Sequence, residues 1–218
     1  MKRVLAIPGS QVMPLPLAVL EGARVRLEPL TPLHVPALLA AANGPRGTFS
    51  LTNVPGDEDG MRRYVEEALA AHAQGLALPF AIVDREAAAV VGSTRFGMAE
   101  RWAWPSPPPG APRLVDAVEI GWTWLAERAQ RTPINTEAKL LLLGHAFEVW
   151  RARRVTLKTD ARNARSRAAI ERIGARFDGV LRAHLPAADG GVRDSAFYSI
   201  VEAEWPAVRV ALGGRLAR

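Results

Sequence analysis

One carboxylate stands inside an otherwise apolar and aromatic run of the sequence. It is Glu119, in the stretch V-E-I-G-W-T-W-L at 118–125. An unpaired buried carboxylate is costly, so a glutamate here is either buried with a partner or faces a cleft. In a cleft, a carboxylate can accept a proton from a reacting group. Glu119 is therefore our first candidate catalytic residue, with a buried ion pair as the alternative.

The basic residues are concentrated in one part of the chain. The net charge is +6 and the isoelectric point is near 10.6. Ten Lys or Arg residues lie between Arg151 and Arg182, against only Asp160, Glu171 and Asp178. Such a patch is either a solvated basic face or a site for a phosphate-bearing cofactor or RNA. No RNP-type aromatic strand is present, which disfavours a nucleic acid.

Two strand-to-helix junctions carry the candidate residues. The run 118–125 is typical of a buried strand, followed by a turn at 126–135 and a helix with Asn135 or Thr136 as N-cap. Glu137 is then expected in the first turn, where it complements the helix dipole. The second unit is a strand at 155–160 and a helix that opens with N-A-R-S at 163–166. Free N–H groups at both helix starts would meet at one end of a sheet, where anions bind well. This coincidence favours the cofactor.

The remaining elements are predicted from their periodicity and turn residues. A strand begins near Ala23, and helices are expected at 32–42, with Thr31 as N-cap, and at 59–74. Hairpins are expected at 78–98 and 179–201, and a final helix at 202–212 is expected to be interrupted by Pro206. The proline-rich segment 102–110 forbids a regular element, and its two tryptophans are expected to pack the loop down.

Composition narrows the class of protein. The chain has 218 residues, 49% of them hydrophobic and 23% charged, as in a globular protein. The absence of cysteine excludes disulfides and a thiol nucleophile, and the four dispersed histidines predict no metal site. We expect an irregular extension at 1–19, one domain at 20–218, no membrane span and a cytoplasmic location.

The motifs together resemble a known family. E-I-G-W-T-W-L, Q-R-T-P-I-N-T-E-A, H-A-F-E, K-T-D-x-x-N-x-x-S and I-G-A are similar to the GNAT N-acetyltransferases over roughly 20–208, most closely to the RimJ/RimL-like ribosomal-protein N-terminal acetyltransferases. The resemblance implies an α/β (α+β) fold with a mixed, mostly antiparallel sheet, splayed in the middle and covered by helices on both faces. It also implies transfer of acetyl from acetyl-CoA to a primary amine, by direct attack and without a metal.

The resemblance assigns roles residue by residue. The family pattern Q/R-x-x-G-x-G/A falls on 130–135, where Pro133 and Asn135 depart from it. A tyrosine that many members place later in the second helix is Ile170 here, so Ser166 is the nearest acid or hydrogen-bond donor to sulfur. Glu119 and Ser166 are the catalytic candidates, and Phe49, Asn53 and Glu119 are expected to contact the acceptor. The expected cofactor contacts are Trp124, Leu125, Gln130, Arg131, Thr132, Ile134, Asn135, Thr136, Asn163, Arg165 and Ser166.

The sequence allows more than one acceptor amine and more than one activity. A lysine amine of pKa about 10.4 costs roughly 4.6 kcal/mol to deprotonate at pH 7, and an α-amine of about 7.8 only roughly 1. A site with few titratable groups therefore suits a protein N-terminal α-amine or a small-molecule amine. The carboxylate expected in RimL-like enzymes has no match near 183–185. The alternatives are a catalytically impaired acetyl-CoA-binding protein and a basic RNA- or ribosome-binding module. A homodimer is also left open.

Overall fold

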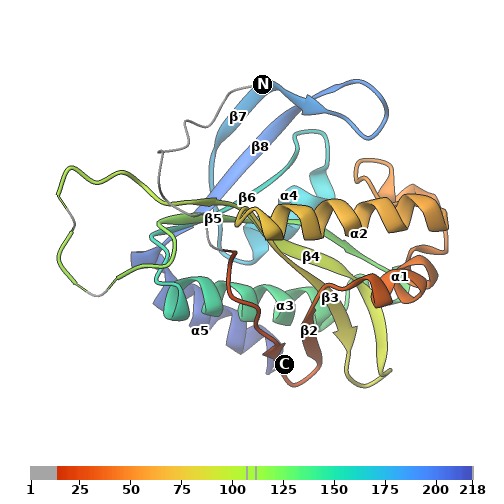
Figure 1. Cartoon of the computed structure of the whole chain (residues 1–218), viewed down its shortest axis with the longest axis horizontal. Helices are drawn as coiled ribbons and strands as arrows, with labels where there is room; N and C mark the ends of the chain where they lie inside the picture. Colours follow the sequence, from red (N-terminus) through yellow and green to blue (C-terminus); the bar gives the residue numbers. More distant parts are fainter. Residues whose placement is uncertain (1–13, 107, 111, 218) are drawn as a thin grey trace.

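The computed structural model describes residues 14–106, 108–110 and 112–217, in which eight strands form one sheet (Figure 1). The strand order is β1-β2-β3-β4-β5-β6-β8-β7. All neighbours are antiparallel except β5 and β6, which are parallel, so the predicted mixed sheet is confirmed. The strands are β1 (Leu20–Glu21), β2 (Val25–Pro29), β3 (Leu78–Asp84), β4 (Ala89–Glu100), β5 (Ala117–Leu125), β6 (Arg154–Asp160), β7 (Arg176–Pro186) and β8 (Val192–Val201).

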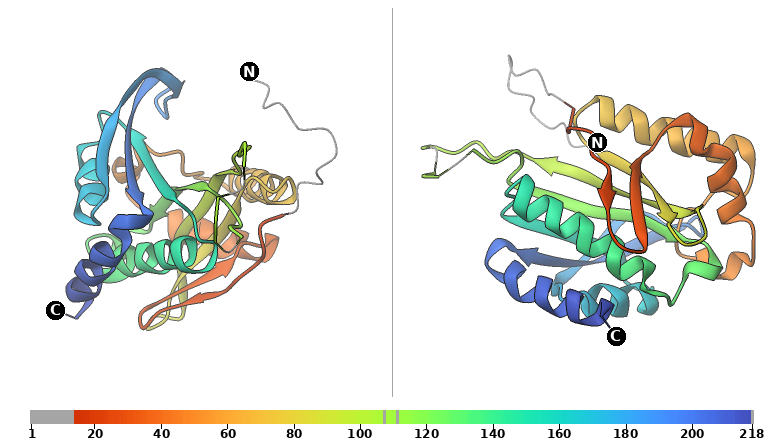
Figure 2. Two further views of the ribbon diagram at one scale, coloured as in Figure 1. Left: turned by 90° about the vertical axis from the view of Figure 1, so that its left-hand side faces the viewer. Right: turned by 90° about the horizontal axis from the view of Figure 1, so that it is seen from below.

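Helices cover both faces of the sheet (Figure 2). One core joins α1 and α2 to the first face through Leu38 and Met61. A second core joins α3 and α5 to the opposite face through Leu142 and Trp205. The α-helices are α1 (Val35–Ala42), α2 (Glu58–Ala73), α3 (Pro133–Gly144), α4 (Ala164–Arg172) and α5 (Trp205–Leu216). Shorter turns are η1 (Pro32–His34), η2 (Arg46–Phe49), η3 (Glu127–Ala129), η4 (His145–Val149) and η5 (Glu202–Glu204).

The parallel strands β5 and β6 stay together only briefly. Their pairing runs from Ala117 opposite Arg154 to Glu119 opposite Thr156, and stops there. Beyond this point the facing edges of the two strands have no ladder partner in each other. The sheet is therefore split, as the resemblance implied.

A β-bulge lies just beyond the split, in the pairing of β5 with β4. Ser93 pairs with Trp124 and Arg95 with Gly121, so β5 has one extra residue. Trp122 takes a positive φ of 51° there, and its ring covers Gly97, where an added Cβ would clash with the indole. The bulge shifts the alternation of side chains along β5. Thr123 consequently faces α3, where its hydroxyl contacts a side chain of that helix.

Two helix starts differ from the sequence-based expectation. Helix α3 begins at Pro133, and its N-cap is Thr132, three or four residues before the predicted N-cap, Asn135 or Thr136. The Oγ1 of Thr132 accepts a hydrogen bond from the N–H of Ile134. Proline suits the first helical position because the N–H there has no intrahelical acceptor. The same reason corrects Pro206, which lies in the first turn of α5 and starts that helix instead of interrupting it.

The other predicted elements are present, with small shifts of their ends. Both hairpins form, as β3–β4 and β7–β8. The first helix begins as a 3-10 turn at Pro32–His34, before α1. Of the predicted N-terminal extension, residues 1–13 lie outside the described residues. Residues 14–19 have no regular structure, but Leu15 is buried and its carbonyl is bonded to the His72 ring.

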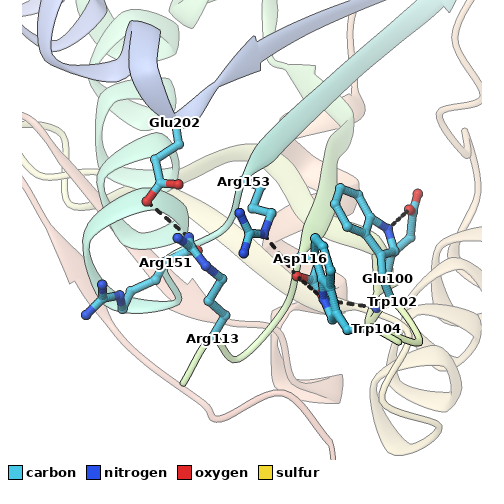
Figure 3. A network of polar contacts seen from close by, with 8 residues as sticks. All are labelled: Glu100, Trp102, Trp104, Arg113, Asp116, Arg151, Arg153 and Glu202. Carbon is cyan, nitrogen blue, oxygen red and sulfur yellow. Dashed lines mark hydrogen bonds and ion pairs between the residues drawn. The ribbon is translucent and has the colours of Figure 1, made fainter. Parts of the chain in front are cut away.

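The two tryptophans of the proline-rich loop contact its base, but both side chains stay exposed, so they pack the loop down less than expected (Figure 3). The buried carboxylate of Asp116 accepts hydrogen bonds from the backbone N–H of Trp102 at 2.9 Å and the indole of Trp104 at 3.2 Å. The Arg153 guanidinium stacks 4.6 Å from the Trp104 ring and also reaches Asp116. These contacts hold the start of the loop against the N-terminal end of β5.

Glu137 holds the start of β2 against α3. Its buried carboxylate accepts hydrogen bonds from three consecutive backbone N–H groups, those of Ala23 at 3.0 Å, Arg24 at 2.7 Å and Val25 at 2.6 Å. A Cβ on Gly22 would lie 2.7 Å from this carboxylate, so only glycine allows the approach. The expectation that Glu137 sits in the first turn and serves the helix dipole is wrong, because α3 begins earlier.

Replacing Glu137 by glutamine should destabilise the fold by about 2–4 kcal/mol, because an amide NH₂ group would face backbone N–H donors in a buried site. Urea denaturation followed by circular dichroism measures the change. Glu66→Gln, on the exposed face of α2, is the matched control and should change stability by less than about 0.5 kcal/mol. Equal stability of the two variants would mean that the Glu137 contacts contribute nothing.

Candidate active site

The split between β5 and β6 opens into a cleft of about 890 Å³. Its walls come from β5 and β6, the turn after β5, the first turns of α3 and α4, and the segment 48–53. The cleft brings together nearly all residues singled out in the sequence. Those that line it are Phe49, Asn53, Glu119, Trp124, Leu125, Gln130, Arg131, Thr132, Asn135, Thr136, Asn163, Arg165 and Ser166.

Ile134 is the exception among the predicted cofactor contacts. Its side chain is buried in the core below α3, and its N–H donates to Thr132 Oγ1 at 3.3 Å. The first-turn positions that line the cleft after Pro133 are Asn135 and Thr136. The N–H groups of a first helical turn are without intrahelical acceptors and favour an anion.

The turn before α3 is built by its own side chains. The Gln130 amide donates to the carbonyl of Leu125 at 2.9 Å, and Thr132 Oγ1 donates to the carbonyl of Ala129 at 2.8 Å. Between them, Arg131 has a φ of 61°, a left-handed conformation that costs a residue with a Cβ about 1–2 kcal/mol. Arg131 is exposed and lines the cleft.

The first turn of α4 forms the facing wall. Asn163 is the N-cap, and its Oδ1 accepts a hydrogen bond from the N–H of Ser166 at 3.0 Å. Arg165 reaches across the cleft and donates to the carbonyl of Thr48 at 2.5 Å. The contact links α4 to the loop that follows α1, so both segments keep one side of the cleft closed.

The loop side of the cleft rests on an aromatic pair. Phe49 is buried and packs edge-on against Trp124, with ring centroids 6.1 Å apart. Arg46 stacks on Phe49 and donates hydrogen bonds to carbonyls of the same loop, including that of Val54. Asn53 is exposed beside them. The indole Nε1 of Trp124 is buried and has no hydrogen-bond partner among the described residues.

Glu119 has a partner that the sequence did not predict. Lys158 Nζ on β6 lies 2.5 Å from Glu119 Oε2, and both side chains are buried or nearly so while lining the cleft. The Lys158 ammonium also lies 5.7 Å from the Trp122 ring and 5.9 Å from that of Phe197. Glu119 therefore has an ion-pair partner and also faces the cleft, so the two alternatives from the sequence hold together.

The cleft is strongly basic. Glu119 is the only carboxylate among the described residues that line it, against five arginines and two lysines, namely Arg131, Arg165, Arg172, Arg193, Arg215, Lys139 and Lys158. No group of three or more His, Cys, Asp or Glu side chains suited to a metal ion occurs in the described part of the chain. An anionic organic ligand fits this donor set better than a cation does.

Comparison with known proteins identifies the fold. A sequence model of the acetyltransferase (GNAT) domain matches residues 24–176. The chain belongs to the GNAT acetyltransferase family. It is therefore an acetyltransferase that uses acetyl-CoA. No sequence among functionally curated proteins matches it. No helix in the described ranges has the length and apolarity needed to cross a membrane.

Solved structures support this assignment. A putative acetyltransferase from T. thermophilus is 36% identical, with a TM-score of 0.73 over 93% of this chain and 98% of that one. A GCN5-related N-acetyltransferase from Brucella melitensis is 27% identical, with a TM-score of 0.77 over 93% and 88%. RimL, a ribosomal L7/L12 α-N-protein acetyltransferase solved with coenzyme A, is 19% identical, with a TM-score of 0.67 over 84% and 98%, a likeness of fold alone.

Lys139 is the main residue of this GNAT cleft that sequence reasoning missed. It is only 5% exposed, and its Nζ contacts the hydroxyl of Thr123 at 2.6 Å and that of Thr94 at 3.5 Å. No carboxylate lies within ion-pair distance of it among the described residues. Burial lowers the pKa of this lysine from 10.5 to about 7. The signal in the sequence is a lone lysine within the apolar run A-K-L-L-L-L.

Because the pKa of Lys139 is lowered, the folded protein binds fewer protons than the unfolded chain between about pH 7 and 10.5. The free energy of unfolding should therefore rise with pH across this window. Below it, the cost of burying the charged amine is fully present. Lys139→Met should remove the penalty, making the variant more stable than the wild type at about pH 6, by on the order of 3 kcal/mol, and little different near pH 10.

Urea denaturation at several pH values tests this, with Arg63→Met on exposed α2 as the control cation. If the stability of the wild type and that of Lys139→Met change with pH in the same way across this window, the buried amine keeps an ordinary pKa.

Proposed function

We propose that this GNAT acetyltransferase moves the acetyl group of acetyl-CoA to a primary amine, a protein N-terminal α-amine or a small-molecule amine, by direct attack. The observation that carries the proposal is the basic cleft at the split between β5 and β6. One end of it is formed by the first turns of α3 and α4, and the other by the Glu119–Lys158 pair, close to where the strands part. The two ends suit the two substrates.

The helix end suits the phosphates of coenzyme A. Arg131, which lines the cleft, and the N–H groups of Asn135 and Thr136 are donors for a pyrophosphate. Pro133, a departure from the family pattern, removes no useful donor, because it occupies the first position of α3. The unpartnered indole N–H of Trp124 offers a buried donor to an amide carbonyl of the pantetheine arm. The residues present therefore fit the cofactor, which supplies the activated acetyl thioester.

The other end suits an amine that is neutral when it attacks. Lys158 and Arg193 line the cleft, and their charges oppose a protonated ammonium nearby. An α-amine loses its proton at a cost of only about 1 kcal/mol at pH 7, far less than a lysine side chain. In this proposal Glu119 draws that proton, directly or through water, and Phe49 and Asn53 contact the acceptor; all three line the cleft. RimL, which has this fold, is named for acetylation of an α-amine, and this supports the same acceptor class here.

Arg131→Ala should weaken the binding of coenzyme A by roughly 3- to 10-fold, because an exposed cation at a phosphate site contributes about 1 kcal/mol. Isothermal titration calorimetry gives the dissociation constant. Arg128→Ala is the matched control, since Arg128 belongs to the same turn but lies outside the cleft, bonded to the carbonyl of Val90. Equal affinities for both variants and the wild type would remove Arg131 from the site.

Glu119→Gln should lower kcat by roughly 10- to 1,000-fold with acetyl-CoA binding within a few-fold, and the defect should shrink as pH rises because the amine then loses its proton unaided. An acceptor panel of N-terminal peptides, lysine peptides, polyamines and aminoglycosides measures the activity. The double variant Glu119→Gln/Lys158→Met separates two roles. Restored activity in the double variant would mean that Glu119 only neutralises Lys158, whereas persistent loss supports proton removal.

The main alternative is a GNAT protein that binds acetyl-CoA without turnover. It predicts an increase in melting temperature with acetyl-CoA and no acetylated product from any amine of the panel. A module that uses only the basic patch for RNA predicts steep salt dependence and no saturable binding of acetyl-CoA. The melting curve and the acceptor panel together distinguish all three.

A further inference from the structure

The proposed transfer releases coenzyme A as a thiolate, and no residue discussed so far gives that thiolate a proton. As the amine nitrogen bonds to the acetyl carbon, the carbon–sulfur bond breaks and coenzyme A departs as a thiolate. Ile170, in the α4 position where other members of the family have tyrosine, carries no proton to give, and it is nearly fully buried beside the cleft. Ser166 offers a hydroxyl, which can donate a hydrogen bond but is far too weak an acid to protonate a thiolate.

Lys139 is the buried proton donor that this cleft contains. Lys139 is among the residues that line the cleft, and its ammonium contacts Thr123, which faces α3 because of the bulge in β5. Thr123 and Thr94 also contact each other, with their hydroxyl oxygens 2.7 Å apart, so the amine is held at a fixed place by a small hydroxyl network. Thr123 is half-buried and itself lines the cleft, which connects this network to the substrate space.

The carboxylates nearest to Lys139 are bound to other partners. Glu137, two residues away on α3, directs its carboxylate at the backbone of β2. Glu119 on β5 is engaged by Lys158 of β6. The remaining charged side chains that line the cleft, from the turn, α4, β8 and α5, are arginines. Burial alone lowers the pKa of Lys139 to about 7.

We propose that Lys139 is the catalytic acid of the reaction: its ammonium gives a proton to the departing sulfur of coenzyme A, with the Thr123 hydroxyl holding the amine in place. This inference rests on the proposed function, because it presupposes transfer from acetyl-CoA. The step is balanced: the nitrogen–carbon bond forms, the carbon–sulfur bond breaks, the sulfur takes the proton and Lys139 becomes neutral. The amine's own proton leaves through Glu119 or water, and Lys139 regains one from solvent through the cleft.

The acidities favour this transfer. A lysine of pKa about 7 gives its proton to a thiolate whose thiol has a pKa of about 8.5 with a gain of roughly 2 kcal/mol. An ordinary lysine of pKa about 10.4 would lose roughly 2.6 kcal/mol in the same step. The neutral amine that remains is also the form that a buried site prefers. Lys158, the other lysine of the cleft, is in an ion pair with Glu119.

A binding experiment tests the contact without turnover. The thiol of bound coenzyme A is titrated by the ultraviolet absorbance of its thiolate, in the wild type, in Lys139→Met and in Lys139→Arg. A permanent cation beside the sulfur should lower the thiol pKa by about one unit in Lys139→Arg relative to Lys139→Met, and the wild type should lie between them, because Lys139 itself loses its proton near pH 7. The same thiol pKa in all three proteins would overturn the proposal.

Kinetics test the proton itself. Wild-type kcat should fall as pH rises above about 7, because the acid is then deprotonated, and Lys139→Met should lack this fall and be at least 10-fold slower at neutral pH. Lys139→Arg keeps the charge but cannot give up a proton, so it should be as slow as Lys139→Met. Ser166→Ala is the matched control, which should lower kcat and keep the descending limb.

Three results would contradict this role. They are a pH profile unchanged in Lys139→Met, a loss of acetyl-CoA affinity above 10-fold with kcat preserved, and acetylation of Lys139 itself found by mass spectrometry. A wild-type protein that acetylates no amine of the panel would instead refute the proposed function. The thiol titration would still decide whether Lys139 contacts the sulfur.

Discussion

The parting of β5 from β6 is the constraint on which the rest of the structure depends. Two parallel strands that pair over only three positions leave the facing edges of both strands without a partner in each other. Backbone groups of that kind must find other partners, and a ligand lying in the gap can supply them. The same parting sends the chain into α3 and α4 on the same side, so that two helix N-termini converge where the ligand enters. The cleft, the hydrogen-bond donors that line it and its preference for an anion thus all follow from the parting of β5 and β6.

Two lysines in this cleft show how environment sets chemical character. Lys158 has a carboxylate at contact distance and two aromatic rings nearby. Lys139 has only hydroxyl groups, so burial acts on it without compensation. Identical side chains in one cleft therefore take different roles, an ion-pair partner and a readily lost proton. The bulge at Trp122 separates them, because it decides which residues of β5 face which side.

Local patterns predicted the elements well, and contacts between distant segments were beyond their reach. The alternation of residues and the turn chemistry identified both hairpins and the strand–turn–helix units that hold the cleft. The start of α3 was misplaced because Thr132-Pro133 and Asn135-Thr136 both resemble helix starts, and only the Thr132 cap geometry distinguishes them. The partners of Glu119 and Glu137 depend on strand order and on the phase shift at the bulge, which no short window of sequence encodes. Lys139 was visible as an anomaly, but its hydroxyl partners were not.

The Glu137 clamp has a consequence for how the protein is made. It joins backbone N–H groups to a carboxylate 112 to 114 residues later in the chain, and contacts of such long range form slowly, because a large loop must close first. During synthesis, the segment that becomes β2 leaves the ribosome long before its acceptor exists. The first turn of α3 lies directly beside the clamp, so the cofactor end of the cleft cannot become rigid until more than half of the chain has been translated. The binding site can therefore form only after the ribosome has released the segment that contains Glu137.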